Sequence, residues 1–227
     1  TDDFNRGDNE GVAYFDVNQR KGWRWNTAKA FLRPTCYSRP NFELWNKAHV
    51  AKLTMETQAN GEKRCTGAQV WTGVEMIEVQ ATREVILSAG SIGSVQILQP
   101  SGIGPADLLK SKGVEVTHDL PGVGANLQDH LQIRSVYKVK EAKTLNTLAG
   151  SLLGKAMIGM EYAFKRSGPM SMAPSQLGAF TKSDPSQPPA NLEYHVQPPS
   201  PDALGEPLHS FPAFTASSSA SSTPIKP

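Results

Sequence analysis

One stretch, residues 83–104, constrains the fold of this chain more than any other. It begins with the apolar run Val85-Ile86-Leu87, which is typical of a parallel strand buried on both faces. Small residues follow at 88–91, and apolar residues then recur at helical spacing. Strand, small-residue turn and helix form the unit from which nucleotide sites are built, because small side chains admit a cofactor and a helix N-terminus offers N–H groups to an anion. Many turns without a ligand share this pattern.

Two motifs within this stretch carry a resemblance to a known family. Gly90-Ser91-Ile92-Gly93-Ser94 and Ser101-Gly102-Ile103-Gly104-Pro105 resemble the second signature of the glucose–methanol–choline (GMC) oxidoreductases, which are FAD-dependent alcohol oxidases and dehydrogenases. Val95 stands where the family usually has proline, and Pro100 where an aliphatic residue is commoner. Further segments resemble family blocks in family order, up to about residue 214: Asp3-Phe4-Asn5, residues 20–28, residues 120–130 and residues 191–195. Within the family, the chain looks most like bacterial alcohol and choline dehydrogenases.

Composition limits the partners that we expect. The chain has 227 residues, enough for one sizeable core or two small ones, with 23 basic and 21 acidic side chains. No clustered basic face is visible in the sequence, so we expect no nucleic-acid partner. No apolar run approaches the roughly 18 residues that span a membrane. Cys36 and Cys65 are widely separated in the sequence and are expected to be reduced thiols. Reduced thiols favour a cytoplasmic location. A chain that begins at Thr1 says little about a leader peptide.

Local patterns predict the order of secondary structure. A helix at 28–32 is expected to be capped by Asn26 or Thr27 and stopped by Pro34. A β-meander is expected around the Asn60-Gly61 turn. Gly150, Gly154 and Gly159 mark close packing or a break in a long helix. The other predictions are strands at 41–45, 50–55, 65–72, 75–79, 114–116, 132–139, 177–181 and 192–196, and helices at 105–113 and 144–166.

These elements predict a mixed α/β (α+β) fold in two parts. Residues 1–130 are interpreted as an α/β FAD-binding-domain segment with the β-meander, and residues 131–214 as part of an antiparallel-sheet substrate domain. The serine-rich residues 215–227 are predicted to be a disordered tail, because they offer little apolar surface to bury. We interpret this end as a truncation or a wrong join, since the family pattern continues there into further strands.

The resemblance implies three FAD-binding residues. Val50 follows a strand at the position where family members bind the FAD adenine through backbone N–H and C=O groups. An edge-strand valine without a ligand fits the sequence equally well. Ala89 and Gly90 are candidates to pack against the ADP half of FAD, because they lack bulk. A tight strand-to-helix turn is the alternative for this pair.

One substrate-binding residue is predicted. Gln176 aligns with a glutamate that holds the quaternary ammonium group in choline-oxidising members, and an amide supplies a dipole in place of that charge. The alternative is a surface glutamine without a role. His195 fits a half-buried strand histidine, and Asp129-His130 a structural pair at a helix end. His49, His118 and His209 have no partner at ligand spacing, so no metal site is predicted.

Several features of a complete enzyme have no counterpart in the sequence. The Gly-x-Gly at Gly122-Val123-Gly124 lacks a third glycine, so we reject NAD binding and interpret this loop as a connection between domains. The family's FAD pyrophosphate loop and its catalytic histidine are both missing, so we predict no catalytic residue in this chain and no activity from it alone.

The resemblance implies that the parent protein oxidises the CH–OH group of a small-molecule alcohol to an aldehyde or ketone by hydride transfer to FAD. Its electron acceptor is not defined by the sequence. Two alternatives stay open: an activity of the choline dehydrogenase type, and a non-catalytic binding or scaffold module derived from the flavoprotein fold.

Overall fold

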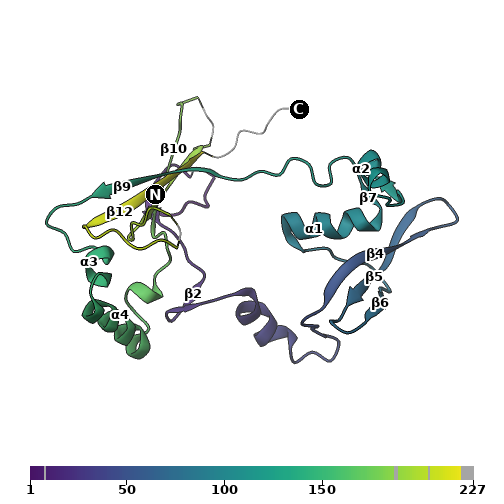
Figure 1. Ribbon diagram of the computed structural model, residues 1–227, viewed down its shortest axis with the longest axis horizontal. Coiled ribbons are helices and arrows are strands. Elements are labelled where there is room, and N and C mark those ends of the chain that lie inside the picture. Colours follow the sequence, from purple (N-terminus) through teal and green to yellow (C-terminus); the bar gives the residue numbers. More distant parts are fainter. Residues whose placement is uncertain (8, 187–188, 204, 221–227) are drawn as a thin grey trace. The chain divides into compact units, whose positions relative to one another are not determined.

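A computed structural model describes residues 1–7, 9–186, 189–203 and 205–220 of the chain. Figure 1 shows its helices and strands. The chain forms two compact units: unit 1 contains residues Thr1–Pro40 and Asp129–Pro227, and unit 2 contains Asn41–Gln128. One boundary between the units falls after Gln128, and the first forty residues belong to unit 1 and not to the same unit as the meander.

Unit 1 is built on a five-stranded antiparallel sheet with the strand order β1-β10-β11-β12-β9. The predicted strands at 132–139, 177–181 and 192–196 all form, within one residue of the expected ends. Because β1 comes from the start of the chain, the sheet joins segments that are far apart in sequence. Its strands are β1 (Gly11–Tyr14), β9 (Leu131–Lys138), β10 (Leu177–Thr181), β11 (Leu192–Gln197) and β12 (Ala213–Ala220).

Strand β12 corrects the prediction of a disordered tail. Residues 215–220 belong to this strand, which pairs with β11 on one side and β9 on the other, so the prediction is wrong for them. Residues 221–227 lie outside the described part of the chain. The prediction failed because backbone pairing on both edges does not require large side chains. Thr215, Ser217 and Ser219 are at most 2% exposed, and within the described residues their hydroxyls have no hydrogen-bond partner.

The predicted long helix is divided in two. Helix α3 (Leu145–Ala149) and helix α4 (Leu152–Lys165) are separated at Gly150, and the Ser151 side chain caps α4 by accepting from the Gly154 amide at 3.0 Å. A Cβ on Gly154 would lie 1.8 Å from the Leu148 carbonyl oxygen. Gly154 therefore permits the close approach of the α3 backbone, and a larger residue there would force the helices apart. The short helix η3 (Pro169–Ser171) follows α4.

A tryptophan-bearing hairpin precedes the first helix of unit 1. Strands β2 (Gln19–Arg20) and β3 (Trp23–Arg24) pair, and the π-helix η1 (Ala28–Cys36) follows. The predicted Asn26 cap is present, since its Oδ1 accepts from the Lys29 amide at 3.0 Å. The predicted stop at Pro34 is wrong, because the helix continues to Cys36. Proline removes only its own N–H donor, and neighbouring π-helical hydrogen bonds remain, such as that from the Tyr37 amide to the Leu32 carbonyl.

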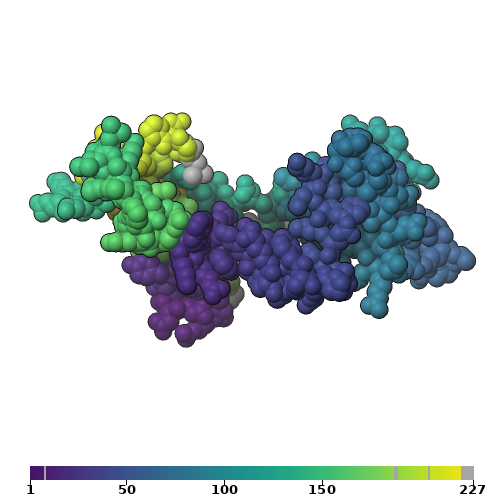
Figure 2. Space-filling model, turned by 90° about the horizontal axis from the view of Figure 1, so that it is seen from below, coloured from purple at the N-terminus to yellow at the C-terminus, as the bar shows by residue number. Residues whose placement is uncertain are grey.

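The hairpin packs on helix α4 of unit 1. The Tyr162 hydroxyl donates to the Gly22 carbonyl at 3.2 Å, and the Arg166 guanidinium lies 4.4 Å from the centroid of the Trp23 ring. Figure 2 shows the same arrangement, with the purple N-terminal residues against the green segment that contains α4. These contacts attach the hairpin to the body of unit 1.

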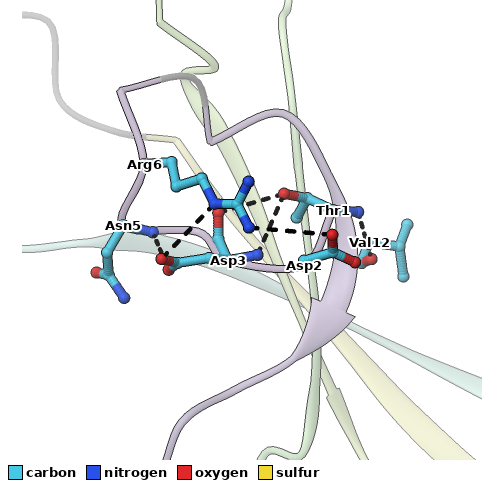
Figure 3. A network of polar contacts seen from close by, with 6 residues as sticks. All are labelled: Thr1, Asp2, Asp3, Asn5, Arg6 and Val12. Atoms are coloured by element: carbon cyan, nitrogen blue, oxygen red, sulfur yellow. Dashed lines mark hydrogen bonds and ion pairs between the residues drawn. The ribbon is translucent and has the colours of Figure 1, made fainter.

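The first residues of the chain fold back on β1 (Figure 3). The Thr1 amino group donates to the Val12 carbonyl at 3.1 Å, and the Asp3 carboxylate accepts from the Asn5 amide at 2.7 Å. Arg6 pairs with Asp2 and Asp3 at 3.9 and 4.0 Å. These ion pairs are exposed, so each contributes at most about 1 kcal/mol, and they mainly shape the turn.

Unit 2 contains the predicted meander as an antiparallel sheet with the order β4-β5-β6. Its strands are β4 (His49–Thr57), β5 (Lys63–Trp71) and β6 (Met76–Gln80). Gly61, in the turn between the first two, has a φ of +84°, as the Asn60-Gly61 pattern predicts. The strands predicted at 41–45 and 85–87 are absent, and Ile86 is 78% exposed. No described strand pairs with either segment, and without a partner an apolar run does not form a ladder.

The signature residues 101–105 organise the helical part of unit 2. Helix α1 (Gly90–Leu98) leads through the short helix η2 (Gln99–Ser101) into β7 (Ile103–Gly104) and α2 (Ala106–Ser111). Strand β7 pairs in parallel with β8 (His118–Asp119), which replaces the strand predicted at 114–116. Gly102 has a φ of +79°, and a Cβ there would lie 2.4 Å from the Glu115 carbonyl oxygen, so this position requires glycine.

The Ser101 hydroxyl joins α1 and η2 to the meander. Its Oγ accepts from the Leu53 amide of β4 at 2.7 Å and donates to the Ile97 carbonyl at 2.5 Å. Ser101 and Leu53 are both buried. The serine of the signature therefore satisfies a buried backbone donor, which is a structural role.

We expect Ser101→Ala to destabilise unit 2 by about 1–3 kcal/mol, because it leaves the buried Leu53 amide unpaired. Urea unfolding followed by circular dichroism measures this, with Ser94→Ala on α1 as the control. A Ser101→Ala chain as stable as the Ser94→Ala chain would contradict the structural role.

Ending the chain after Pro212 removes β12 and separates β11 from β9. We expect this chain to lose the cooperative unfolding of unit 1, whereas a chain that ends after Ala220 keeps the strand and serves as the reference. Thermal unfolding of the two chains is the measurement. Equal melting temperatures would show that β12 does not stabilise the sheet.

Candidate functional site

A concave site of unit 1 lies beside the five-stranded sheet. It is a cavity of about 700 Å³, within the range of small-molecule sites. Its walls come from the segment after β1 (residues 15–19), from residues 170–175 before β10, from the β2–β3 hairpin, from Tyr162 of α4 and from His195 of β11. Three separate stretches of the sequence, residues 15–24, 162–175 and 195, thus line one space.

The His195 ring in this cavity is held by three neighbours. Its Nε2 lies 2.6 Å from Glu193 Oε1, and the Phe15 ring stacks on it with a centroid distance of 4.8 Å. Strand register puts Gly178 opposite His195. A Cβ on Gly178 would lie 2.2 Å from Phe15 Cζ, so the absence of a side chain there admits the phenyl ring. Gly178, Phe15 and Glu193 together fix the orientation of the imidazole.

This arrangement decides which ring nitrogen carries a proton. An ionised Glu193 carboxylate only accepts hydrogen bonds, so Nε2 of His195 is the donor between them. In the neutral ring, Nδ1 is then an acceptor, and it has no hydrogen-bond partner among the described residues. From the sequence, His195 was expected to be a half-buried strand histidine without a function. The available signal was the alternation Glu193-x-His195, which places both side chains on one face of a strand.

Gln176 lies next to this site. Its carbonyl accepts from the Phe15 amide at 2.8 Å, and its amide donates to the Val196 carbonyl at 3.3 Å, which extends the pairing of β10 with β11. Its side chain is half-buried and lines a smaller cavity of about 250 Å³ that shares Phe15 and five other residues with the larger one. The structure thus brings Gln176 close to His195, but not into the wall of the larger cavity.

A serine–histidine–aspartate arrangement occurs elsewhere in unit 1. His209 Nε2 lies 2.9 Å from Asp202 Oδ1, and its Nδ1 lies 3.3 Å from Ser200 Oγ. Ser200 is fully buried, however, and its hydroxyl accepts from Asn146 Nδ2 at 2.6 Å. A serine that no substrate reaches is not a nucleophile, so we interpret this group as a link between α3 and the loop before β12.

The predicted FAD-binding residues lie in unit 2, on two elements that pack together. Val50 belongs to β4, an edge strand of the meander, and α1 packs against this strand. An edge strand has peptide groups free of strand partners, which is what binding through backbone N–H and C=O groups requires. Val50 lies at a register irregularity between Val50 and Lys52.

The start of α1 offers room for a ligand. Ala89 is the N-cap, its side chain makes no capping bond, and both Ala89 and Gly90 are exposed. Gly90 has a φ of +84°, and no atom lies within 4 Å of where its Cβ would be. Open space beside uncapped N–H groups fits the close approach of a negatively charged cofactor. A cavity of about 500 Å³ extends from Ser91 to the loop at 122–128.

That loop does not resemble a dinucleotide-binding turn. Gly124 has a φ of +83°, a Cβ there would lie 3.0 Å from Gln99 Nε2, and Gln99 donates to the Val123 carbonyl at 3.3 Å. The loop packs on α1, and no helix follows it. Asp129 and His130 are exposed, and the Asp129 carboxylate accepts from the His130 amide at 2.8 Å ahead of strand β9. The helix end predicted for this pair is therefore wrong.

Within the described residues, no group of three histidine, cysteine or acidic side chains has metal-binding geometry. Cys36 and Cys65 are free thiols in different units. In the same part of the chain, the helices are too short or too polar to cross a bilayer.

Comparison with known proteins gives a consistent result. The family model described as GMC oxidoreductase matches residues 1–132. The alcohol dehydrogenase [acceptor] of Pseudomonas putida is 36% identical over 199 residues, which cover 86% of this chain and 35% of that protein. The oxygen-dependent choline dehydrogenase of Photobacterium profundum is 36% identical over 198 residues, covering 87% of this chain and 34% of the relative. The chain thus spans about a third of the length of these relatives.

Solved structures agree on the fold. Pyridoxine 4-oxidase from Mesorbium loti superposes with a TM-score of 0.73 at 23% identity, over 96% of this chain and 38% of that chain. A formate oxidase variant from Aspergillus oryzae gives a TM-score of 0.76 at 21% identity, over 93% and 40%. A fungal aryl-alcohol oxidase gives 0.65 at 27% identity, over 77% and 30%.

These findings confirm the predicted family and the predicted mixed α/β fold class. They also confirm FAD as the cofactor of the proteins that this chain resembles. The match extends over more than half of the sequence and includes both the hairpin segment and the signature around α1. On this evidence, the chain belongs to the GMC oxidoreductase family.

Proposed function

We propose that this chain is part of an FAD-dependent oxidoreductase that oxidises the CH–OH group of an alcohol to an aldehyde or ketone. The observation that carries the proposal is the 700 Å³ cavity with His195 in its wall, within a chain of the GMC family. His195, whose Nδ1 has no hydrogen-bond partner among the described residues, lines a space of the size that a small substrate needs.

The cofactor contacts proposed for this chain are those of the adenosine half. Val50 on the edge of β4 binds the adenine through its backbone, and Ala89 and Gly90 leave the ADP moiety free to approach α1. Bound FAD supplies the hydride acceptor of the reaction. The protein's part is to bind and orient both groups and to exclude water.

The charges around the cavity favour a neutral substrate. One carboxylate, that of Asp16, and one guanidinium, that of Arg24, line it, and the other polar side chains are amides, hydroxyls and His195. Gln176 in the neighbouring cavity adds a dipole and no charge. A quaternary ammonium ion gains from nearby negative charge, and among the lining side chains the single carboxylate is balanced by the single guanidinium.

The His195 ring has a proposed binding role at this site. Because Glu193 accepts from Nε2, the neutral ring presents Nδ1 as an acceptor for a substrate hydroxyl. Phe15 and Gly178 prevent the ring from turning away. We assign no proton transfer to this residue.

We expect the 227-residue chain by itself not to retain FAD. The sequence contains no Gly-x-Gly-x-x-Gly loop to receive the pyrophosphate, and contacts to the adenosine half alone leave those charges unpaired. The chain is mixed with excess FAD and desalted, and the visible flavin absorbance is recorded. A yellow protein with one FAD per chain would overturn this expectation. Lysozyme treated in the same way controls for carry-over.

We expect Gln176→Glu to raise the preference for choline over a straight-chain primary alcohol by about tenfold, since a carboxylate adds attraction only for the cation. The ratio of kcat/KM values for the two substrates is measured in the protein encoded by the complete reading frame that contains this chain. Gln197→Glu, a change of the same size on the neighbouring strand, is the control. An unchanged ratio in Gln176→Glu would remove Gln176 as a selectivity residue.

A further inference from the structure

A second concave site of unit 1 has no part in the proposed function. It is a groove of about 610 Å³ lined by Trp23, Trp25, Lys29, Arg33 and Pro34. Its residues come from the hairpin and from η1. They share no lining residue with the cavity beside His195.

The backbone places two indoles opposite two cations. Residues Lys21 and Gly22 both have positive φ, 52° and 73°, which is the tight turn that suits a two-residue hairpin, and Arg20 pairs with Trp23 across it. Trp25 follows two residues after Trp23. Lys29 and Arg33 are four residues apart, close to one turn of the π-helix, so they lie on the same side of it.

Lys29 is held in a defined position between the rings. Its Nζ donates to the Arg24 carbonyl at 3.2 Å, and it lies 5.2 Å from the Trp23 ring centroid and 5.9 Å from that of Trp25. Cation–π attraction of about 0.5–1 kcal/mol at each exposed ring favours this placement. The ammonium group is therefore held near both indole rings in the wall of the groove.

Positive charges gather around the groove. Among the described residues, no carboxylate forms an ion pair with Lys29, Arg33 or Arg20. Arg20 lies over Trp25, with its guanidinium carbon 5.4 Å from the ring centroid. An aromatic ring attracts a cation less strongly than a full negative charge does. The cation–π contacts therefore do not cancel the positive field of the groove.

We propose that this groove binds a small organic anion that carries its charge on a flat aromatic body, such as an aromatic carboxylate or sulfonate. The anionic group pairs with Lys29 and Arg33, and the aromatic body packs against Trp23 and Trp25. Two lining cations and a volume of about 610 Å³ match one small molecule. A nucleic acid or a long acidic peptide needs a more extended basic surface.

Calorimetric titration of the 227-residue chain with 2-naphthalenesulfonate tests the proposal, and 2-naphthalenemethanol is the neutral probe of the same shape. We expect saturable binding of one sulfonate per chain, about tenfold weaker binding of the alcohol, and weaker sulfonate binding as salt is raised. Equal binding of the two probes, or no saturable binding of the sulfonate, would overturn the proposal.

Variants locate the site. Lys29→Gln and Arg33→Gln are each expected to weaken sulfonate binding by roughly fivefold, because each removes one charged donor. Lys155→Gln changes an exposed lysine of α4 that does not line the groove, and is expected to leave the affinity unchanged. An equal loss in Lys155→Gln, or unchanged affinity in both groove variants, would contradict the site.

Two further measurements test whether a loss of affinity comes from unfolding and whether binding depends on charge. Far-UV circular dichroism of each variant separates lost binding from lost folding, and Arg33→Lys, which keeps the charge, is expected to retain most of the affinity. Stronger binding of a glutamate-rich peptide than of the sulfonate would assign the groove to an acidic macromolecule and overturn the small-molecule proposal.

Discussion

The pairing of β12 with both β11 and β9 is the interaction on which unit 1 depends. It joins a strand that begins at residue 131 to the β10–β11 pair, and β1 then completes the sheet at its other edge. The small side chains of Thr215, Ser217 and Ser219 fit between larger neighbours, for example Arg134 and His195 on either side of Ser217. Burying three hydroxyls that have no partner in the described part of the chain costs free energy, and the ladder on both edges offsets this cost.

The same sheet positions the candidate site. Because β1 pairs with β10, the chain leaves β1 at Phe15 directly above Gly178, and register places Gly178 opposite His195. The ring that stacks on the imidazole, Phe15, is therefore far from His195 in sequence. Its hydrogen-bond partner, Glu193, is only two residues away. In unit 2, the Ser101 hydroxyl has the comparable role of fixing α1 on β4, and so of placing Gly90 near the strand that contains Val50.

Local chemistry was sufficient to predict much of this fold. Alternating residues and the Asn60-Gly61 turn predicted the meander. The single helix predicted at 144–166 is instead divided near Gly150, a position that the sequence left open between close packing and a break. The pairing of strands that lie far apart in the sequence could not be predicted from local patterns. The serine-rich β12 forms because it has partners on both edges, while the apolar run at 85–87 stays irregular because no described strand lies beside it. For the site, motifs identified the family and led to Val50, Ala89, Gly90 and Gln176 as proposals. The Phe15–His195 stack follows only from strand register, which the sequence does not display.

Anaerobic flavin reduction tests the central proposal, that the cavity beside His195 belongs to an alcohol-oxidising flavoprotein. The protein encoded by the complete reading frame that contains this chain is mixed, without oxygen, with a series of straight-chain and aromatic primary alcohols. The account predicts that at least one alcohol bleaches the visible flavin band, and that replacing His195 with phenylalanine raises the alcohol concentration needed for half-bleaching. A flavin that every alcohol leaves oxidised, while dithionite reduces it, would contradict the account.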